Sequence, residues 1–418
     1  MTTNWSGNVE FGERELVAPR SVEELQEVVR GNDRVKALGT RHSFSAVADT
    51  SGALVDMTQM PWRLEIDREQ RTVTVSAAVP YAELALAIEA EGLALKNMGS
   101  LPHISVGGAA ATGTHGSGDG NQVLAASVTA LDLVGADGAA VHLDRTDPAF
   151  EGSVVALGAL GIVTALTLEL VPTYTVRQDV FVDAPWDDVL AHFDAVTAGA
   201  YSTSMFIRDW SSDVVDQIWY KSVVDGDGEP RLPAGVVAHP PSVDPLAPAH
   251  GAPEEMLTTQ GGVPGPWLER LPHFRPEKPP SNAGDELQSE FLLDRAHAVE
   301  ALQRMKEIAA QIAPVLLVSE IRTVAADTLW LSGAYGRDTV GVHFTWHKDV
   351  EGVCALLPAV EERLADLGAR PHWGKVYSDG YPDLLARYPR GVEFVALADK
   401  ADPERKFRNA YLDRVLGA

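Results

Sequence analysis

The sequence has little cysteine and few basic residues, and both shortages restrict what the protein can be. Cys354 is the one cysteine among 418 residues, which excludes an internal disulfide, and its apolar neighbours predict a helix face turned toward the core. The 34 lysine and arginine residues are outnumbered by 59 aspartate and glutamate residues. The net charge of -25 repels nucleic acid and anionic membrane surfaces, so we expect neither as a partner.

Long apolar runs and targeting signals are also missing from the sequence. The longest uncharged stretch, between Glu151 and Glu169, contains three glycines and is explained better by a buried strand or turn than by a membrane span. The amino terminus lacks the basic start and apolar centre of a secretory peptide, so we expect a cytoplasmic protein. With 45% hydrophobic residues the chain can bury a sizeable core, and we expect a monomer of two or three domains.

Two common nucleotide-binding signatures are absent, and a different glycine pattern stands in their place. Neither G-x-G-x-x-G nor G-x-x-x-x-G-K-[ST] occurs, so NAD and ATP folds find no support. Residues 39–45 form a glycine-led turn after an apolar run, and backbone N–H groups in such a turn can cradle a pyrophosphate. Residues 100–118 are dense in glycine and alanine, which lets a flat ligand lie directly on the backbone. Tight turns remain the alternative explanation for both segments.

Apolar periodicity predicts a mixed α/β first domain of roughly 175 residues. A helix is expected at 21–31, with a capping box of Ser21 and Glu24, and with Gly31 just past its end in a left-handed conformation. A second helix is expected at 81–91. Strands are expected at 35–38, 52–57, 72–76, 128–134, 141–143 and 163–171. Further along the chain we expect a helix at 294–312 and strands at 315–324 and 339–346.

Residues 225–286 are crowded with proline and glycine, including Pro240, Pro241, Pro264, Pro266, Pro279 and Pro280. A segment of this length without regular structure is a linker or a functional loop. Its aromatic residues, Trp267 and Phe274, and His273 favour a loop that covers a site, because disordered tails are poor in aromatics. A passive surface loop is the alternative.

Polar residues alternate with apolar ones in the two later strands. Glu320 and Arg322 stand two apart, so in a strand they project from one face, and His343 and Thr345 repeat the pattern. Two neighbouring strands could therefore present all four side chains together, although a solvated face with a surface ion pair fits the pattern too. His343 and His347 have the spacing of metal ligands on a helix, but they lie on a predicted strand, so we expect no metal site.

Taken together, residues 39–45, 100–118 and 158–170 resemble the FAD domain of the vanillyl-alcohol oxidase family. Within that family the chain is most similar to bacterial alditol oxidases. The similarity continues through residues 264–274, 319–332, 343–349 and 371–376. It implies an α+β, two-domain flavoprotein. A PCMH-type FAD-binding domain would span 1–175, a sheet-plus-helix substrate or cap domain 176–372 with the proline-rich loop at 225–286, and a C-terminal segment, 373–418, would return to the FAD domain.

The resemblance also implies the roles of individual residues. His42 would carry FAD covalently, because it occupies the histidine of the family's G-x-x-H-S-F motif, and a neutral imidazole is a competent nucleophile. The other cofactor-binding residues would be Gly39, Thr40, Arg41, Ser43, Phe44, Ser100, Ser105, Gly108, Thr112, Gly113, His115, Ile162 and His372. The substrate would be bound by Ser100, Glu320, Arg322, Thr345 and Lys375. The catalytic residues would be Lys375, Arg322 and His343.

The implied reaction is oxidation of the primary hydroxyl of an alditol such as xylitol, sorbitol or glycerol to the aldose, with O2 reduced to H2O2. Lys375 and Arg322 would stabilise developing negative charge, while the proton acceptor could be His343, a lysine of lowered pKa or water. Gly99 stands where alditol oxidases have alanine more often, which leaves reaction with oxygen open. The alternative activity is that of an aldonolactone oxidase or dehydrogenase of the gulonolactone oxidase type.

Overall fold

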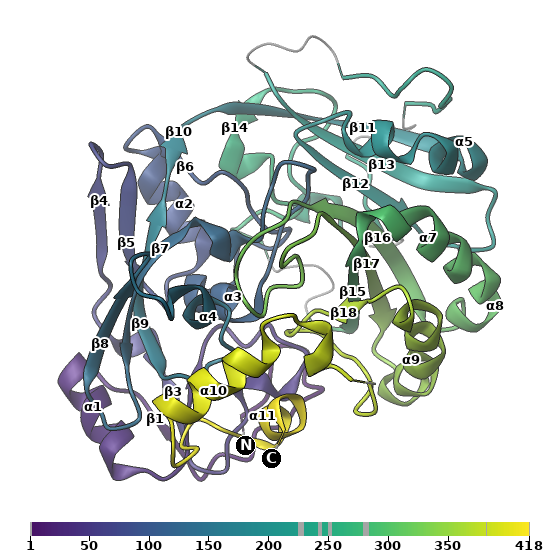
Figure 1. The fold of residues 1–418 in the computed structure, drawn as a ribbon. Coiled ribbons are helices and arrows are strands. Elements are labelled where there is room, and N and C mark those ends of the chain that lie inside the picture. The colour runs from purple at the N-terminus through teal and green to yellow at the C-terminus, as the bar shows by residue number, and fades with distance from the viewer. Residues whose placement is uncertain are drawn as a thin grey trace.

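The computed structural model describes residues 2–224, 230–240, 245–249, 253–278, 284–381 and 383–417. Part of the predicted proline-rich loop, including Pro241, Pro279 and Pro280, lies outside the described residues. Two groups of sheets lie side by side, and the C-terminal helices pack below them (Figure 1).

The N-terminal part of the chain contains three sheets. The three-stranded parallel sheet has the order β1 (Glu15–Val17), β3 (Ala53–Asp56), β2 (Val35–Leu38), and α1 (Val22–Gly31) accompanies it. The five-stranded antiparallel sheet has the order β4 (Leu64–Asp67), β5 (Thr72–Ser76), β9 (Ile162–Glu169), β7 (Val128–Val134), β8 (Ala140–Asp144). The two-stranded sheet pairs β6 (Leu93–Ala94) with β10 (Val171–Pro172). The helices here are α2 (Tyr81–Glu89), α3 (Val106–Thr112) and α4 (Phe150–Val154).

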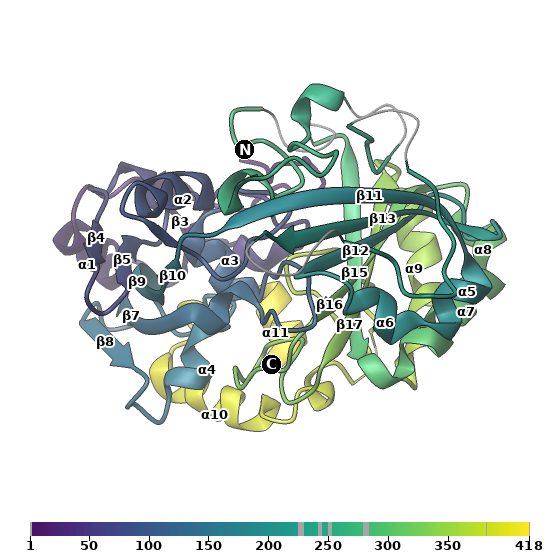
Figure 2. The same ribbon diagram turned by 90° about the horizontal axis from the view of Figure 1, so that it is seen from above.

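A larger antiparallel sheet follows in the chain. Its eight strands have the order β14 (Gly265–Pro266), β11 (Thr175–Pro185), β13 (Val214–Val223), β12 (Ser202–Ile207), β16 (Leu316–Val324), β17 (Thr339–His347), β15 (Glu286–Asp294), β18 (Arg370–Pro371). Its helices are α5 (Trp186–Ala191), α6 (Phe193–Thr197), α7 (Ala298–Glu307), α8 (Ala309–Ile312) and α9 (Val350–Ala365). They lie on the side of the large sheet that faces away from the N-terminal sheets (Figures 1 and 2). The opposite face is therefore free to line a cavity between the two groups.

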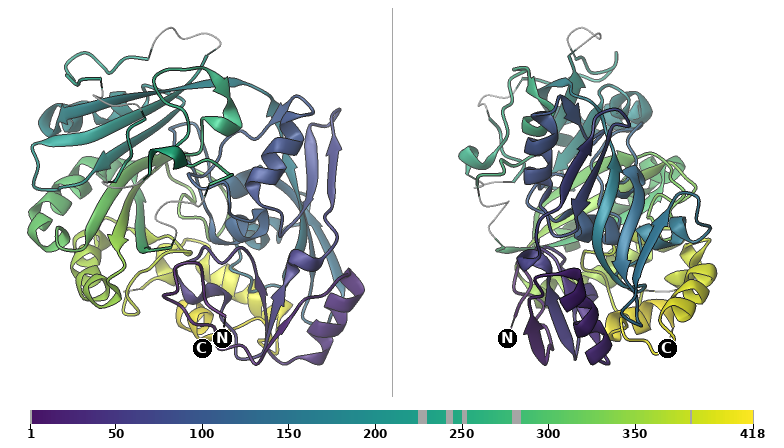
Figure 3. Two further views of the ribbon diagram at one scale, coloured as in Figure 1. Left: turned by 180° about the vertical axis from the view of Figure 1, so that it is seen from behind. Right: turned by 90° about the vertical axis from the view of Figure 1, so that its left-hand side faces the viewer.

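The chain ends against its own beginning. The last helices, α10 (Gly391–Ala401) and α11 (Ala410–Leu416), lie at the same end of the molecule as the N-terminal sheet (Figures 1 and 3). Just before α11, the Asn409 amide donates hydrogen bonds to the carbonyl oxygens of Ala46, Val47 and Asp49. These bonds fix the segment that follows the glycine-led turn. The largest cluster of buried apolar side chains contains residues of both sheet groups and marks no boundary between them, so the bounds at 175 and 372 stay a prediction.

The predicted α+β class and the elements expected from periodicity are confirmed within a few residues, with three corrections. The helix expected at 294–312 is interrupted at Ile308, so that α7 and α8 are separate. Gly31 is the last residue of α1, and the helix ends because Asn32 is extended. Cys354 is exposed: α9 buries Val353 and the residues spaced from it by whole turns, and the adjacent position points about 100° away.

Candidate active site

A cavity of about 300 Å³ lies between the N-terminal sheets and the large sheet. Every sequence-predicted site residue except Gly113 lines it. Gly113 instead ends α3 in a left-handed conformation, with φ of 68°, which is the ordinary role of glycine after a helix. The structure thus brings the predicted cofactor and substrate residues around one cavity.

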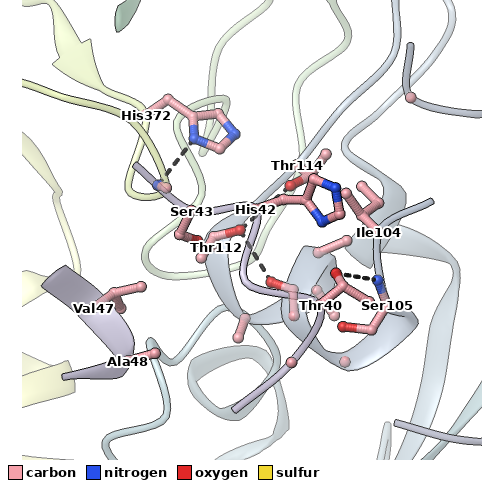
Figure 4. Close-up of a pocket in the computed structure, with 18 of the residues that line it drawn as sticks. Thr40, His42, Ser43, Val47, Ala48, Ile104, Ser105, Thr112, Thr114 and His372 are labelled. Atoms are coloured by element: carbon pink, nitrogen blue, oxygen red, sulfur yellow. Dashed lines mark hydrogen bonds between the residues drawn. The ribbon is translucent and has the colours of Figure 1, made fainter. Parts of the chain in front are cut away.

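The turn that carries His42 is held by the first residues of the chain. Arg41 has a positive φ of 65°, and its carbonyl accepts a hydrogen bond of 2.7 Å from the backbone N–H of Trp5. The Trp5 ring stacks on the His42 ring, with centroids 5.2 Å apart. Burial, helped by nearby His103, lowers the pKa of His42 to about 4, so the ring is neutral at neutral pH. The turn lies against the start of α3, where the backbone N–H of Ser105 donates a hydrogen bond of 3.2 Å to Thr40 Oγ1 (Figure 4).

His42 Nδ1 is buried and has no hydrogen-bond partner among the described residues. Buried polar atoms are nearly always satisfied, so an atom of this kind is expected where a ligand completes the site. Two glycines near Ser105, Gly39 in the turn and Gly108 in α3, also line the cavity without a side chain. A Cβ added to Gly39 or Gly108 would lie 2.9 or 2.8 Å from Ser105 Oγ, so any other residue would crowd this wall of the cavity. The residues therefore fit a flat cofactor laid against the backbone.

The substrate end of the cavity is built on the central strands of the large sheet. Glu320 on β16 lies directly opposite His343 on β17, as the polar alternation predicts. On the far side of β17, His343 lies opposite Glu290 of β15. Lys375 reaches the same point from the turn after β18, where its backbone N–H donates to the carbonyl of His372. Three adjacent strands and one turn thus meet at a buried polar cluster.

Glu290 is the centre of this cluster, and its carboxylate is fully buried. One oxygen accepts a 2.5 Å hydrogen bond from Arg322 Nη2, and the other lies 3.1 Å from Lys375 Nζ. Burial opposes ionisation of Glu290, but Arg322 and Lys375 outweigh it and hold its pKa well below the usual value. Burial likewise opposes ionisation of Glu320, but Arg322 and His273 outweigh it and hold the pKa of Glu320 well below its usual value. Two carboxylates and two cations therefore share one desolvated site.

His343 is surrounded by hydrogen-bond donors. Its Nδ1 lies 3.2 Å from Lys375 Nζ and 3.5 Å from Arg322 Nη2, and Thr345 Oγ1 lies 3.4 Å from Nε2. Because Nδ1 faces two donors, the ring proton is assigned to Nε2. Burial and the neighbouring Lys375 lower the pKa of His343 well below its usual value. Burial also lowers the pKa of Lys375, although Glu290 opposes the shift.

Glu290 and His273 were missing from the residues predicted to form the site. The strand β15 carries a readable signal, because Glu286, Gln288 and Glu290 alternate with apolar or small residues and project from one face. His273 lies in the segment expected to cover a site, and the described part of that segment does so: His273 and Phe274 line the cavity. Trp267 from the same segment is buried elsewhere and donates to Glu89.

The described residues contain one group whose spacing could hold a metal ion. Ligand atoms of His115, Glu290 and His372 lie within 4.8 Å of one another. The charge of Glu290 is already balanced by Arg322 and Lys375, and these cations would repel a metal ion at the same carboxylate. His343 and His347 stand four residues apart along a strand, roughly 13 Å, which is too far to share an ion.

Comparison with known proteins agrees with this geometry. A family model described as "FAD binding domain" matches residues 14–144, and one described as "D-arabinono-1,4-lactone oxidase" matches residues 285–415. The crystal structure of cholesterol oxidase from B. sterolicum superimposes with a TM-score of 0.79, covering 99% of this chain and 96% of that one, at 15% identity. The fold and the cavity define an FAD-binding oxidoreductase.

Sequence identity to individual relatives identifies the family more closely. Alditol oxidase from a Streptomyces species is 46% identical over 417 residues, which cover 99% of this chain and 98% of the relative. L-gulono-1,4-lactone dehydrogenase from Mycobacterium tuberculosis is 30% identical over 438 residues, 99% of each chain. The chain belongs to the alditol oxidase family, as its sequence motifs predict. No helix in the described ranges is long and apolar enough to cross a membrane.

Proposed function

We propose that this protein oxidises the primary hydroxyl of an alditol to the aldose and passes the electrons to O2, which forms H2O2. The observation that carries the proposal is the cluster of Glu320, Arg322 and Lys375 at one end of the cavity, in which the first two side chains are buried and that of Lys375 is 14% exposed. Carboxylates accept and cations donate hydrogen bonds, so such a cluster can bind successive hydroxyls of a polyol. The alditol oxidase at 46% identity supports the same substrate class.

FAD, when bound, supplies the acceptor for the hydride and the reaction of the reduced state with O2. Gly39, Ser105 and Gly108 would hold it against the backbone, together with the other predicted cofactor residues that line the cavity. We propose that His42 forms the covalent bond to it, because this imidazole is neutral and its Nδ1 is free of other hydrogen bonds among the described residues. Acid precipitation tests the bond: yellow colour should stay with the protein, and His42→Ala should release it.

Lys375 is the proposed proton acceptor. Its Nζ lies 3.1 Å from Glu290 Oε2 and 3.2 Å from His343 Nδ1, and as a neutral amine it keeps one lone pair that can accept the proton of the substrate hydroxyl. After taking the proton it becomes a cation beside the oxidised carbon, and Arg322 adds a second positive charge. His343, Ser100, Glu320 and Thr345 orient the amine and the remaining hydroxyls.

Initial rates with xylitol, sorbitol and glycerol, followed as H2O2 release, test the activity. We expect turnover with at least one of the three, and loss of flavin reduction in Lys375→Met without a comparable loss of substrate binding. Equal turnover in Lys375→Met would remove this residue from the reaction. The rate should rise with pH through the lowered pKa of Lys375, because the neutral amine is the reactive form.

A second candidate is an aldonolactone oxidase or dehydrogenase. It is favoured by the lactone oxidase model, which matches residues 285–415 and so includes Glu320, Arg322 and Lys375. Gulonolactone in the same assay separates the two activities. The greater identity to an alditol oxidase than to a lactone dehydrogenase favours the alditol.

The predicted cytoplasmic location and monomeric state rest on the sequence and remain predictions. Fractionation of the native cells tests the location, and light scattering of the purified holoenzyme tests the oligomeric state.

A further inference from the structure

Lys221 is a fully buried lysine that the reaction proposed above does not use. It lies on β13 with 1% of its surface exposed. Its Nζ donates hydrogen bonds to the carbonyl oxygens of Leu271 and Pro272 and to Nδ1 of His273, the last at 2.9 Å. An ammonium group has three N–H donors, so these three acceptors satisfy it completely. Lys221 therefore fixes the turn at residues 271–274.

His273 connects this lysine to the substrate end of the cavity. Because its Nδ1 accepts from Lys221, the ring proton belongs on Nε2, which donates to Glu320 Oε1 at 2.9 Å. In the other tautomer a lone pair of Nε2 would face the carboxylate and repel it. The rings of Trp219 and Phe206 pack edge-on against His273 at 5.1 and 5.7 Å, so the imidazole has little freedom to rotate.

The same turn contacts the opposite wall of the cavity. The backbone N–H of His273 donates to the carbonyl oxygen of Ser100 at 3.0 Å. Ser100 and Glu320 are both predicted to bind the substrate, and one histidine thus holds the first by its backbone and the second by its side chain. Replacing His273 should therefore affect substrate binding more than the chemical step.

We propose that Lys221 and His273 are positioning residues that orient the Glu320 carboxylate toward the polyol. Lys221 selects the tautomer of His273, and His273 donates the hydrogen bond that fixes one oxygen of Glu320. The other oxygen, Glu320 Oε2, lies 3.8 Å from Arg322 Nε, next to the other polar side chains that would bind the substrate. This role rests on the proposed alditol oxidation and adds to it the residues that determine how tightly the polyol is held.

Two variants of His273 distinguish a role in orienting Glu320 from a general role in stabilising the fold. Glutamine can accept from Lys221 through its carbonyl and donate to Glu320 through its amide, whereas leucine can do neither. We expect His273→Leu to raise KM for xylitol at least tenfold with kcat changed less than threefold, and His273→Gln to stay within threefold of wild type. Calorimetric titration of xylitol into anaerobically reduced holoenzyme should give the same ratios for Kd. Equal values for His273→Leu and wild type, or equal losses in both variants, would overturn the proposal.

Lys221→Met should raise KM in the same direction as His273→Leu, with Lys306→Met as the control. Lys306 is a half-buried lysine of α7 whose Nζ donates to the backbone carbonyl of Ser212, on the side of the sheet that the helices cover, so its variant should keep the wild-type KM. A KM in Lys221→Met that is no higher than in Lys306→Met would contradict the proposal.

A substrate-free measurement distinguishes this proposal from the proposed function. NMR spectra of the resting holoenzyme labelled with 15N-histidine should show His273 protonated at Nε2. The His273 signal is assigned by its absence in His273→Gln, and it should shift in Lys221→Met. An Nδ1-protonated His273 would refute the positioning role even if xylitol is a substrate. If wild type turned over none of the polyols, the alditol activity would be refuted. The tautomer of His273 would still show whether the hydrogen bonds from Lys221 through His273 to Glu320 exist.

Discussion

Glu290→Gln removes one charge from the centre of the buried cluster while keeping the size of the side chain. In the wild-type protein the carboxylate contacts Arg322 at 2.5 Å and Lys375 at 3.1 Å, and no part of it is exposed to solvent. Removal of one partner from a buried ion pair typically costs about 3–5 kcal/mol, because the other partner is left uncompensated. Glutamine can still accept from Arg322, so we expect a loss of about 3 kcal/mol in the free energy of unfolding.

Urea unfolding of the holoenzyme at neutral pH, followed by tryptophan fluorescence at matched flavin content, measures this loss. Glu307→Gln is the control, because Glu307 pairs with Arg363 at the surface, where an ion pair contributes about 0–1 kcal/mol. Glu290→Gln should also move the rise of kcat/KM to lower pH, since Glu290 raises the pKa of Lys375. A loss in Glu290→Gln no larger than in Glu307→Gln would refute the assignment of Glu290 as the balancing charge.

The stability at low pH, the flavin content and the reaction with oxygen each depend on a different part of the cavity. The folded-state pKa of Glu290 lies well below its ordinary value of 4.5, so its stabilisation is lost as pH falls below that value. The free energy of unfolding should therefore decrease below about pH 4.5 in wild type, and decrease less in Glu290→Gln. Gly108→Ala places a Cβ 2.8 Å from Ser105 Oγ and should lower the ratio of flavin to protein, whereas Gly120→Ala, with open space around it, should not; equal ratios would contradict the backbone bed. In Gly99→Ala the added Cβ would have no atom nearer than 3.7 Å, so the flavin content should be unchanged. The stopped-flow rate of flavin reoxidation by O2 should stay within threefold of wild type, and a larger decrease would show that a methyl group at this position hinders the reaction with oxygen.

The parts of the site that were predictable from sequence are those that depend on local pattern. Alternation placed Glu320 and His343 on the same face of neighbouring strands, and the register of β16 with β17 sets them directly opposite each other. The predicted substrate residues were identified by resemblance, and the structure shows that they share one cavity.

The parts that were missed depend on contacts between distant segments. Glu290 is 30 residues or more from both Arg322 and Lys375 along the chain, so no local pattern reveals that its charge is balanced. His273 lies in a proline-rich segment without regular structure, and its ring is oriented by contacts with Lys221 and Trp219, which are more than 50 residues away along the chain. Gly113 does not line the cavity, and its left-handed conformation at the end of α3 is reason enough for a glycine there, so its role toward the cofactor stays a prediction.

Alditol oxidation is tested most directly by mixing the holoenzyme with xylitol under anaerobic conditions and then admitting O2. The visible flavin band should bleach with xylitol and return with O2, and one H2O2 should be released for each turnover. An unchanged spectrum with xylitol, sorbitol and glycerol, together with bleaching by gulonolactone, would contradict alditol oxidation and assign the buried cluster to a lactone instead.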